Sequence, residues 1–138
     1  MDYRLCISIR ENSEGIRKSA YAFYNQHDFC VYRRVVDSAE SDALAEYVRV
    51  AGVALSYFRI NIRNRYYTEH FSELLHEDGG VVLCPYKEIV CAFTAYRNDK
   101  CKIPEEFIRL AEWFDTPSVR FDYSEESGIQ KACDSLIN

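Results

Sequence analysis

Hydrophobic and polar residues alternate near the start of the chain. Between residues 3 and 10 every second side chain is polar or small, which predicts a strand with one buried face. Asn12 or Ser13 can then cap a helix, since apolar side chains recur at helical spacing as far as Asn25. The segment 29–36 is mainly aromatic and β-branched, which favours a second strand. This part of the chain therefore predicts strand, helix and strand.

The clearest periodicity lies between residues 38 and 64. Its apolar side chains recur every three or four residues and form one helical stripe: Leu44, Tyr47, Val48, Ala51, Leu55, Phe58 and Ile62. Ser38 or Ser41 can cap this helix, which is predicted to run to about residue 64. A second helical stripe spans residues 67–75. The pattern predicts two consecutive helices.

The second half of the chain predicts a hairpin, a helix, a strand and a last helix. Residues 81–84 and 89–96 are apolar without alternation and flank a tight segment, which favours a buried antiparallel hairpin. Pro104 suits the first position of a helix whose apolar stripe ends at about Phe114. Residues 119–123 alternate as a strand, and a helix is predicted over 124–137.

These elements predict a fold of the α+β class. Their order is β-α-β-α-α-β-β-α-β-α, with a central sheet of about five strands and helices packed against it. The 138 residues are the size of one ordinary domain and show no repeat or interdomain linker. We therefore expect residues 1–138 to form a single globular domain.

Charge is unevenly distributed along this sequence. The net charge is −5, and the segment from Pro104 onward accounts for all of it, with eight acidic against three basic side chains. Such a segment can attract a basic protein and select it by charge. The residues expected to contact that partner are Glu112, Trp113, Asp115, Asp122, Tyr123, Glu125 and Glu126. The alternative is ordinary helix chemistry, because several of the acids fall in predicted first turns, where the helix dipole favours anions.

Arginine is concentrated around the end of the long predicted helix. Arg59 and Arg63 are four residues apart, so they share a helix face and repel each other unless an anion lies opposite. With Arg49 and Arg65 they form an alternative anion-binding set for a phosphate, a nucleic-acid backbone or an acidic protein. They can equally pair with acids such as Glu46. The net negative charge of the chain makes nucleic acid an unlikely partner.

Motifs for catalysis or cofactors are absent from the sequence. Cys84 is the best-placed thiol nucleophile, but no spacing links it to His27, His70 or any other base. The cysteine and histidine spacings do not match zinc sites, and no nucleotide-binding or serine-hydrolase motif is present. We expect no cofactor and no metal, and lean against an enzyme.

The cellular compartment is predicted from the length of the apolar runs and from the cysteines. No apolar run approaches the length of a membrane span, and the N-terminal residues do not resemble a signal peptide. The six cysteines are therefore expected to be reduced, in a cytoplasmic protein without a membrane partner.

The main functional hypothesis is a small soluble protein-binding domain. It would be an inhibitor or immunity-type protein that neutralises a basic partner such as a nuclease. The alternative is a small cofactor-free enzyme, a thiol hydrolase or a nuclease, acting on an anionic substrate. A second alternative is a nucleic-acid-binding adaptor. The sequence defines neither the identity of the partner nor an oligomeric state.

Overall fold

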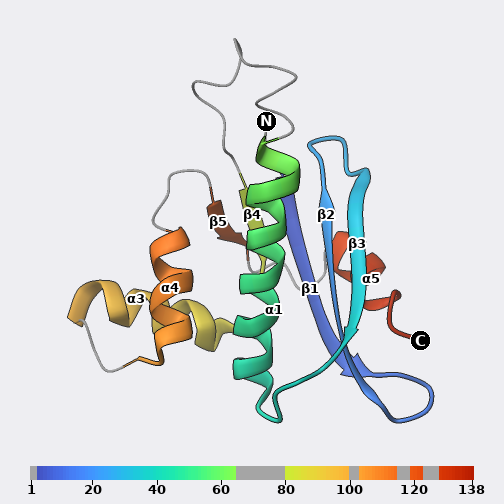
Figure 1. Cartoon of the computed structure of the whole chain (residues 1–138), viewed down its shortest axis with the longest axis horizontal. Helices are drawn as coiled ribbons and strands as arrows, with labels where there is room; N and C mark the ends of the chain where they lie inside the picture. Colours follow the sequence, from blue (N-terminus) through green and yellow to red (C-terminus); the bar gives the residue numbers. More distant parts are fainter. Residues whose placement is uncertain (1–2, 65–79, 100–102, 115–118, 123–127) are drawn as a thin grey trace.

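A five-stranded mixed sheet forms the centre of the structure (Figure 1). The computed structural model describes residues 3–64, 80–99, 103–114, 119–122 and 128–138. The strands are β1 (Tyr3–Glu11), β2 (Arg17–Tyr24), β3 (Cys30–Asp37), β4 (Gly80–Leu83) and β5 (Val119–Asp122), in the spatial order β3-β2-β1-β4-β5. The pairs β1/β2 and β2/β3 are antiparallel, whereas β1/β4 and β4/β5 are parallel.

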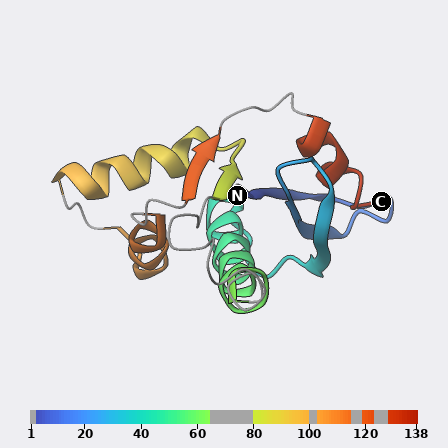
Figure 2. The same cartoon turned by 90° about the horizontal axis from the view of Figure 1, so that it is seen from above.

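Helices cover both faces of this sheet (Figure 2). They are α1 (Ala43–Tyr57), which continues into the π-helix η1 (Phe58–Arg63), then α3 (Lys87–Asp99), α4 (Glu105–Phe114) and α5 (Gly128–Asp134). The predicted α+β class with five strands is confirmed. Among the described residues, no helix has the length and apolar character needed to cross a membrane.

Two apolar cores lie on opposite faces of the sheet. The larger one packs α1, α3 and α4 against alternate side chains of the strands, such as Leu5, Ile7 and Phe23. The smaller one packs Ile129 and Cys133 of α5, with neighbouring residues, against the other face. A β-strand projects successive side chains to opposite faces, so the central strands are buried on both sides.

The segment predicted as a helix between residues 13 and 25 is instead β2. Tyr21 and Phe23 belong to the larger core, whereas Ala20 and Ala22 belong to the smaller one. A strand that is buried on both faces loses the apolar–polar alternation by which strands are recognised. Apolar residues at positions compatible with helical spacing then favoured the wrong element.

The predicted hairpin is also only half present. Residues 80–83 form β4, but residues 87–99 form α3, whose Ile89 and Phe93 are buried one helical turn apart. The backbone N–H of Ile89 donates to the carbonyl of Tyr86 at 3.2 Å, at the start of that helix. The predicted helix over 67–75 lies outside the described residues.

The long predicted helix is confirmed as α1 and η1. Asp42 caps it by accepting a hydrogen bond from the N–H of Ala45 at 3.0 Å. Val48, Ala51, Leu55 and Phe58 of the predicted stripe are buried against the sheet, as expected.

Candidate functional site

The parallel strands β1 and β4 meet where the chain changes direction across the sheet. After β1 the chain continues into β2 and β3 on one side, and after β4 it passes to β5 on the other. In open sheets with parallel strands, ligands bind in the crevice outside the carboxyl ends of the strands at such a switch point. The end of β4 beside β1 is therefore the expected position of a ligand site.

Strands β1 and β4 separate because a proline follows β4. Their pairing ends at Cys6 and Leu83. If the ladder continued, the N–H of residue 85 would face the carbonyl of Ile7, but Pro85 has no N–H. The side chain of Gln130, from α5, donates to that carbonyl instead, at 2.9 Å. The two strands thus diverge at a defined point, and the buried carbonyl of Ile7 keeps a hydrogen-bond donor.

A crevice of about 470 Å³ opens at this point. It is lined by residues of β1, by the turn after β4 and by α5: Ile7, Ser8, Ile9, Arg10, Pro85, Tyr86, Gln130 and Asp134. Arg10 is exposed, whereas Asp134 is half-buried and accepts a hydrogen bond from Gln130 at 3.2 Å. Burial raises the pKa of Tyr86, so its hydroxyl stays protonated at neutral pH. The lining therefore offers hydroxyl groups and a guanidinium.

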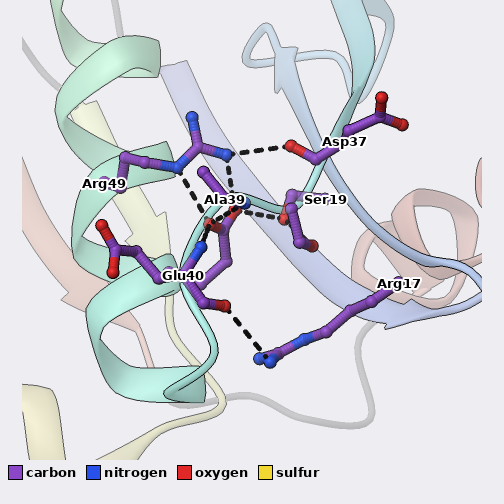
Figure 3. A network of polar contacts seen from close by, with 8 residues as sticks. Arg17, Ser19, Asp37, Ala39, Glu40 and Arg49 are labelled. Atoms are coloured by element: carbon purple, nitrogen blue, oxygen red, sulfur yellow. Dashed lines mark hydrogen bonds and ion pairs between the residues drawn. The ribbon is translucent and has the colours of Figure 1, made fainter.

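A buried carboxylate on α1, that of Glu46, accepts hydrogen bonds from a network of polar groups. Figure 3 labels its partners Ser19, Ala39, Glu40 and Arg49. Oε1 of Glu46 accepts hydrogen bonds from the backbone N–H groups of Ala39 and Glu40 at 2.8 and 3.0 Å, and from Arg49 Nε at 2.9 Å. Oε2 accepts from Ser19 Oγ at 2.5 Å and from Arg49 Nη2 at 2.7 Å. Arg49 Nη2 also donates to the carbonyl of Asp37 at 3.2 Å. The network ties the connection between β3 and α1 to β2.

These contacts keep Glu46 ionised although it is fully buried. Burial opposes the charged form, but the hydrogen bonds from Arg49, Ser19 and the two backbone N–H groups outweigh it and lower the pKa to about 2. The carboxylate is therefore charged throughout the neutral range, and Arg49 balances it.

Tyr47 connects this network to the crevice. Its hydroxyl donates to the carbonyl of Leu83, the last residue of β4, at 3.2 Å. Its ring meets the ring of Tyr86 edge to face, with the centroids 5.3 Å apart. The N-terminal part of α1 and the wall of the crevice are thus held together by the packed rings of Tyr47 and Tyr86.

The predicted contact residues that the structure describes, Glu112, Trp113 and Asp122, do not line this crevice. Glu112 and Trp113 lie on α4, where Trp113 lines a separate groove of about 770 Å³ against Arg49, Gly52 and Val53 of α1. Asp122 ends β5. The other four predicted contact residues lie outside the described residues: Asp115, Tyr123, Glu125 and Glu126.

The predicted arginine set is divided as well. Arg49 is paired with Glu46, which was the alternative expected for it. Arg59 is exposed and Arg63 is half-buried, and both lie on η1. Arg59 follows Arg49 by ten residues, which is about 15 Å along the helix axis. Arg65 lies outside the described residues. Arg49 therefore does not share one anion site with Arg59.

The thiol proposed as a nucleophile is not activated. Cys84 is buried, which raises its pKa, and its Sγ donates to the carbonyl of Tyr86 at 3.1 Å. His27 lies exposed in the turn between β2 and β3. A protonated, enclosed thiol is a poor nucleophile.

Several lining residues of the crevice were not predicted. Ser8 and Arg10 are polar positions of an alternating strand. The alternation indicates the polar face of the strand but does not indicate that this face binds a ligand. Pro85 directly after an apolar run signals the end of a strand. Gln130 gave no local signal, because its partner Ile7 is 123 residues away.

The fold is shared with solved structures of known proteins. No family model and no curated protein sequence matches the chain. Among solved structures, the ribonuclease H1 LC11, isolated from compost by a metagenomic approach, is 10% identical, with a TM-score of 0.57 over 99% of this chain and 93% of that chain. The chain has the ribonuclease H fold.

Two further structures with this fold hold nucleic acid. LC11 ribonuclease H1 in complex with an RNA/DNA hybrid is 16% identical, with a TM-score of 0.55 and coverage of 99% of this chain and 93% of that chain. The foamy viral protease–reverse transcriptase in complex with an RNA/DNA hybrid is 6% identical, with a TM-score of 0.58. That match covers 99% of this chain and 19% of the viral chain.

The ribonuclease H fold corrects the main functional hypothesis. The interpretation as an inhibitor or immunity-type protein with a basic protein partner is wrong, because the similar structures are nucleases and complexes with nucleic acid. The expectation that nucleic acid is an unlikely partner is wrong for the same reason. That expectation rested on the net charge of −5, which is a sum over the whole chain and does not describe the charge at one crevice.

Proposed function

We propose that the chain binds nucleic acid across the crevice between β1 and β4, and that an RNA/DNA hybrid duplex is the ligand. The observation that carries the proposal is the position of Arg10, an exposed guanidinium that lines the crevice at the switch point of a ribonuclease H fold. Two of the three similar structures described above are complexes with RNA/DNA hybrids.

The chemistry of the crevice suits a sugar–phosphate backbone. Arginine binds phosphate oxygens through several N–H groups, and serine and tyrosine hydroxyls commonly contact phosphate and sugar. Ser8 and Tyr86 supply such hydroxyls beside Arg10. The 2′-hydroxyl of the RNA strand can both donate and accept, so it has partners among these groups and the carboxylate of Asp134.

Local charge also supports an anionic ligand. Residues 3–64, which form β1 to β3, α1 and η1, contain nine basic and seven acidic side chains, a net charge of +2 within a chain of −5. Since salt screens charges over about 8–10 Å, a ligand beside β1 responds to this part of the chain more than to distant acids.

Fluorescence anisotropy with a labelled hybrid tests the proposal. Arg10→Ala should weaken hybrid binding about tenfold and reduce the slope of log K against log salt by about 1, as expected for the loss of one phosphate contact. The matched control is Arg4→Ala. Arg4 lies on the same strand and is also exposed, but it pairs with Asp28 at 3.2 Å and does not line the crevice.

The control variant should bind the hybrid as the wild type does. Equal losses in Arg10→Ala and Arg4→Ala would show that binding is diffuse and that the crevice is not the site. Absence of hybrid binding at low salt would reject the function itself. Duplex DNA and duplex RNA, measured in parallel, report whether the hybrid is preferred.

Hydrolysis of the hybrid is a second candidate function, favoured by the likeness to ribonuclease H1. Gel analysis of the same incubations reads cleavage directly.

We also infer a cytoplasmic location. Within the described ranges the thiols of Cys6, Cys30, Cys84, Cys91 and Cys133 are free, which is typical of a reducing compartment.

A further inference from the structure

Glu46 is the one charged side chain that is fully buried among the described residues. Glu46 directly precedes Tyr47, which contacts the wall of the proposed nucleic-acid site, and its carboxylate has two possible uses. It can coordinate a divalent cation, or it can hold the protein together through hydrogen bonds. The contacts of Glu46 distinguish these uses.

All the bonding capacity of this carboxylate is taken. A carboxylate has about four lone-pair directions, and five protein donors already approach Glu46 within 2.5–3.0 Å. Two of them belong to the guanidinium of Arg49, which is itself a cation. A divalent ion at this carboxylate would have to displace Arg49 and expose backbone N–H groups of Ala39 and Glu40.

The crevice offers few other ligands for a cation. Many nucleases use two divalent ions about 3.5–4 Å apart, which require several carboxylates. Of the described residues that line the crevice, Asp134 alone is acidic, while the buried Ser8 and Gln130 are neutral. Within the part of the chain that the structure describes, no three histidine, cysteine, aspartate or glutamate side chains are grouped as metal ligands. This donor set does not fit a two-cation centre.

We infer that the chain holds an RNA/DNA hybrid without divalent cations and does not cleave it by a cation-dependent reaction. This inference rests on the proposed function. Its consequence is a further activity. The bound protein covers part of the sugar–phosphate backbone of the hybrid and shields it from nucleases that must contact the same backbone. In this arrangement Glu46 and Arg49 shape the crevice wall through α1 and Tyr47, and the hybrid contacts Arg10.

The test begins with the protein alone. Titration with Mn²⁺, followed by electron paramagnetic resonance of the free ion, should detect no stoichiometric site in the wild type. The Glu46→Gln variant should titrate like the wild type, as should the control Glu112→Gln, which removes an exposed carboxylate on α4. A stoichiometric Mn²⁺ site in the wild type would overturn the inference, and its loss in Glu46→Gln alone would identify the ligand.

Hybrid binding is then compared in EDTA and in millimolar Mg²⁺ at equal ionic strength. The dissociation constants should agree within about twofold, and the hybrid should remain intact in Mg²⁺. Binding that requires Mg²⁺, or cleavage by the protein in Mg²⁺, would overturn the inference. Wild-type protein should also slow digestion of the hybrid by an added ribonuclease H, and Arg10→Ala should shield it about tenfold less effectively.

The two proposals fail in different ways. If no hybrid binds under any condition, the proposed function is rejected, while the Mn²⁺ titration still decides whether this fold keeps a cation site. If the hybrid binds and is cut in Mg²⁺, the proposed function stands and the inference is rejected.

Discussion

Gln130 donates a hydrogen bond from Nε2 to the main-chain carbonyl of Ile7 at 2.9 Å, across 123 residues of chain. Both groups are buried, and Pro85 cannot supply the N–H that a longer β4 would have provided. The bond therefore satisfies the carbonyl at the point where β1 and β4 part. The crevice and the docking of α5 depend on the same amide.

Replacing this amide should destabilise the fold. Gln130→Leu keeps most of the side-chain volume but leaves the Ile7 carbonyl without a donor, which costs about 1–3 kcal/mol. Urea denaturation measures the loss. The neighbouring Lys131→Ala removes an exposed side chain from the same helix and should change stability by less than about 0.5 kcal/mol. Equal effects of the two variants would contradict the role given to Gln130.

Glu46 should make stability depend on acid pH. Its pKa is lowered from 4.5 to about 2 in the folded protein, so the unfolded chain binds the proton more tightly. The resulting stabilisation is complete above pH 4.5 and is lost as the pH falls towards 2, for a total of about 3 kcal/mol. Denaturation at a series of pH values should show a shallower dependence for Glu46→Gln than for the exposed control Glu14→Gln. Identical curves would show that Glu46 does not carry this linkage.

The buried stripe of α1 should carry a large share of the stability. Leu55 is 2% exposed in the larger core, so Leu55→Ala should cost about 2–5 kcal/mol. Val53 on the same helix is 43% exposed, and Val53→Ala should cost less than about 1 kcal/mol. Chemical denaturation compares the two directly, and a loss below about 0.5 kcal/mol for Leu55→Ala would mean that the stripe is not enclosed.

Thiol reactivity should divide the described cysteines into two groups. Cys30 and Cys91 are exposed and should react with iodoacetamide in the native protein. Cys6, Cys84 and Cys133 are enclosed, and burial raises the pKa of each, to about 12 for Cys133. They should react only after denaturation, which peptide mapping by mass spectrometry can follow. Rapid labelling of Cys84 in the native protein would contradict its assignment as an enclosed, unreactive thiol.

The sequence predicted those elements whose two sides carry different kinds of residue. In β1 the side chains toward the larger core are apolar, whereas Arg4, Ser8 and Arg10 on the other side are polar, so the period of two is visible. In α1 the buried stripe alternates with exposed residues, so the period of three to four residues is visible. β2 and α3 were assigned wrongly for opposite reasons. β2 is buried on both faces, so its small Ala20 and Ala22 looked no more strand-like than helical. α3 is rich in β-branched and aromatic residues, whose strand propensity concealed the one-turn spacing of Ile89 and Phe93.

The candidate site was harder to predict because distant segments create it. Arg10, Tyr86 and Asp134 become neighbours only when β1 lies beside β4 and α5 packs against β1. Composition showed where charge lies along the chain but not in space. For Arg49 the sequence left two alternatives open, a shared anion site or a pair with an acid such as Glu46, and the structure pairs it with Glu46, three residues before it.

The smaller core has a consequence for synthesis. Its sheet side comes mainly from β1 and β2, with Leu83 from β4, and its other side is supplied by Ile129, Cys133 and Ile137. A ribosome that has made only the first half of the chain has therefore produced a sheet face with no cover. That face presents Tyr24 beside Cys6, Ala20 and Ala22, whose small side chains limit the apolar surface that a nascent chain exposes. Completion of the fold must wait until α5 has left the exit tunnel.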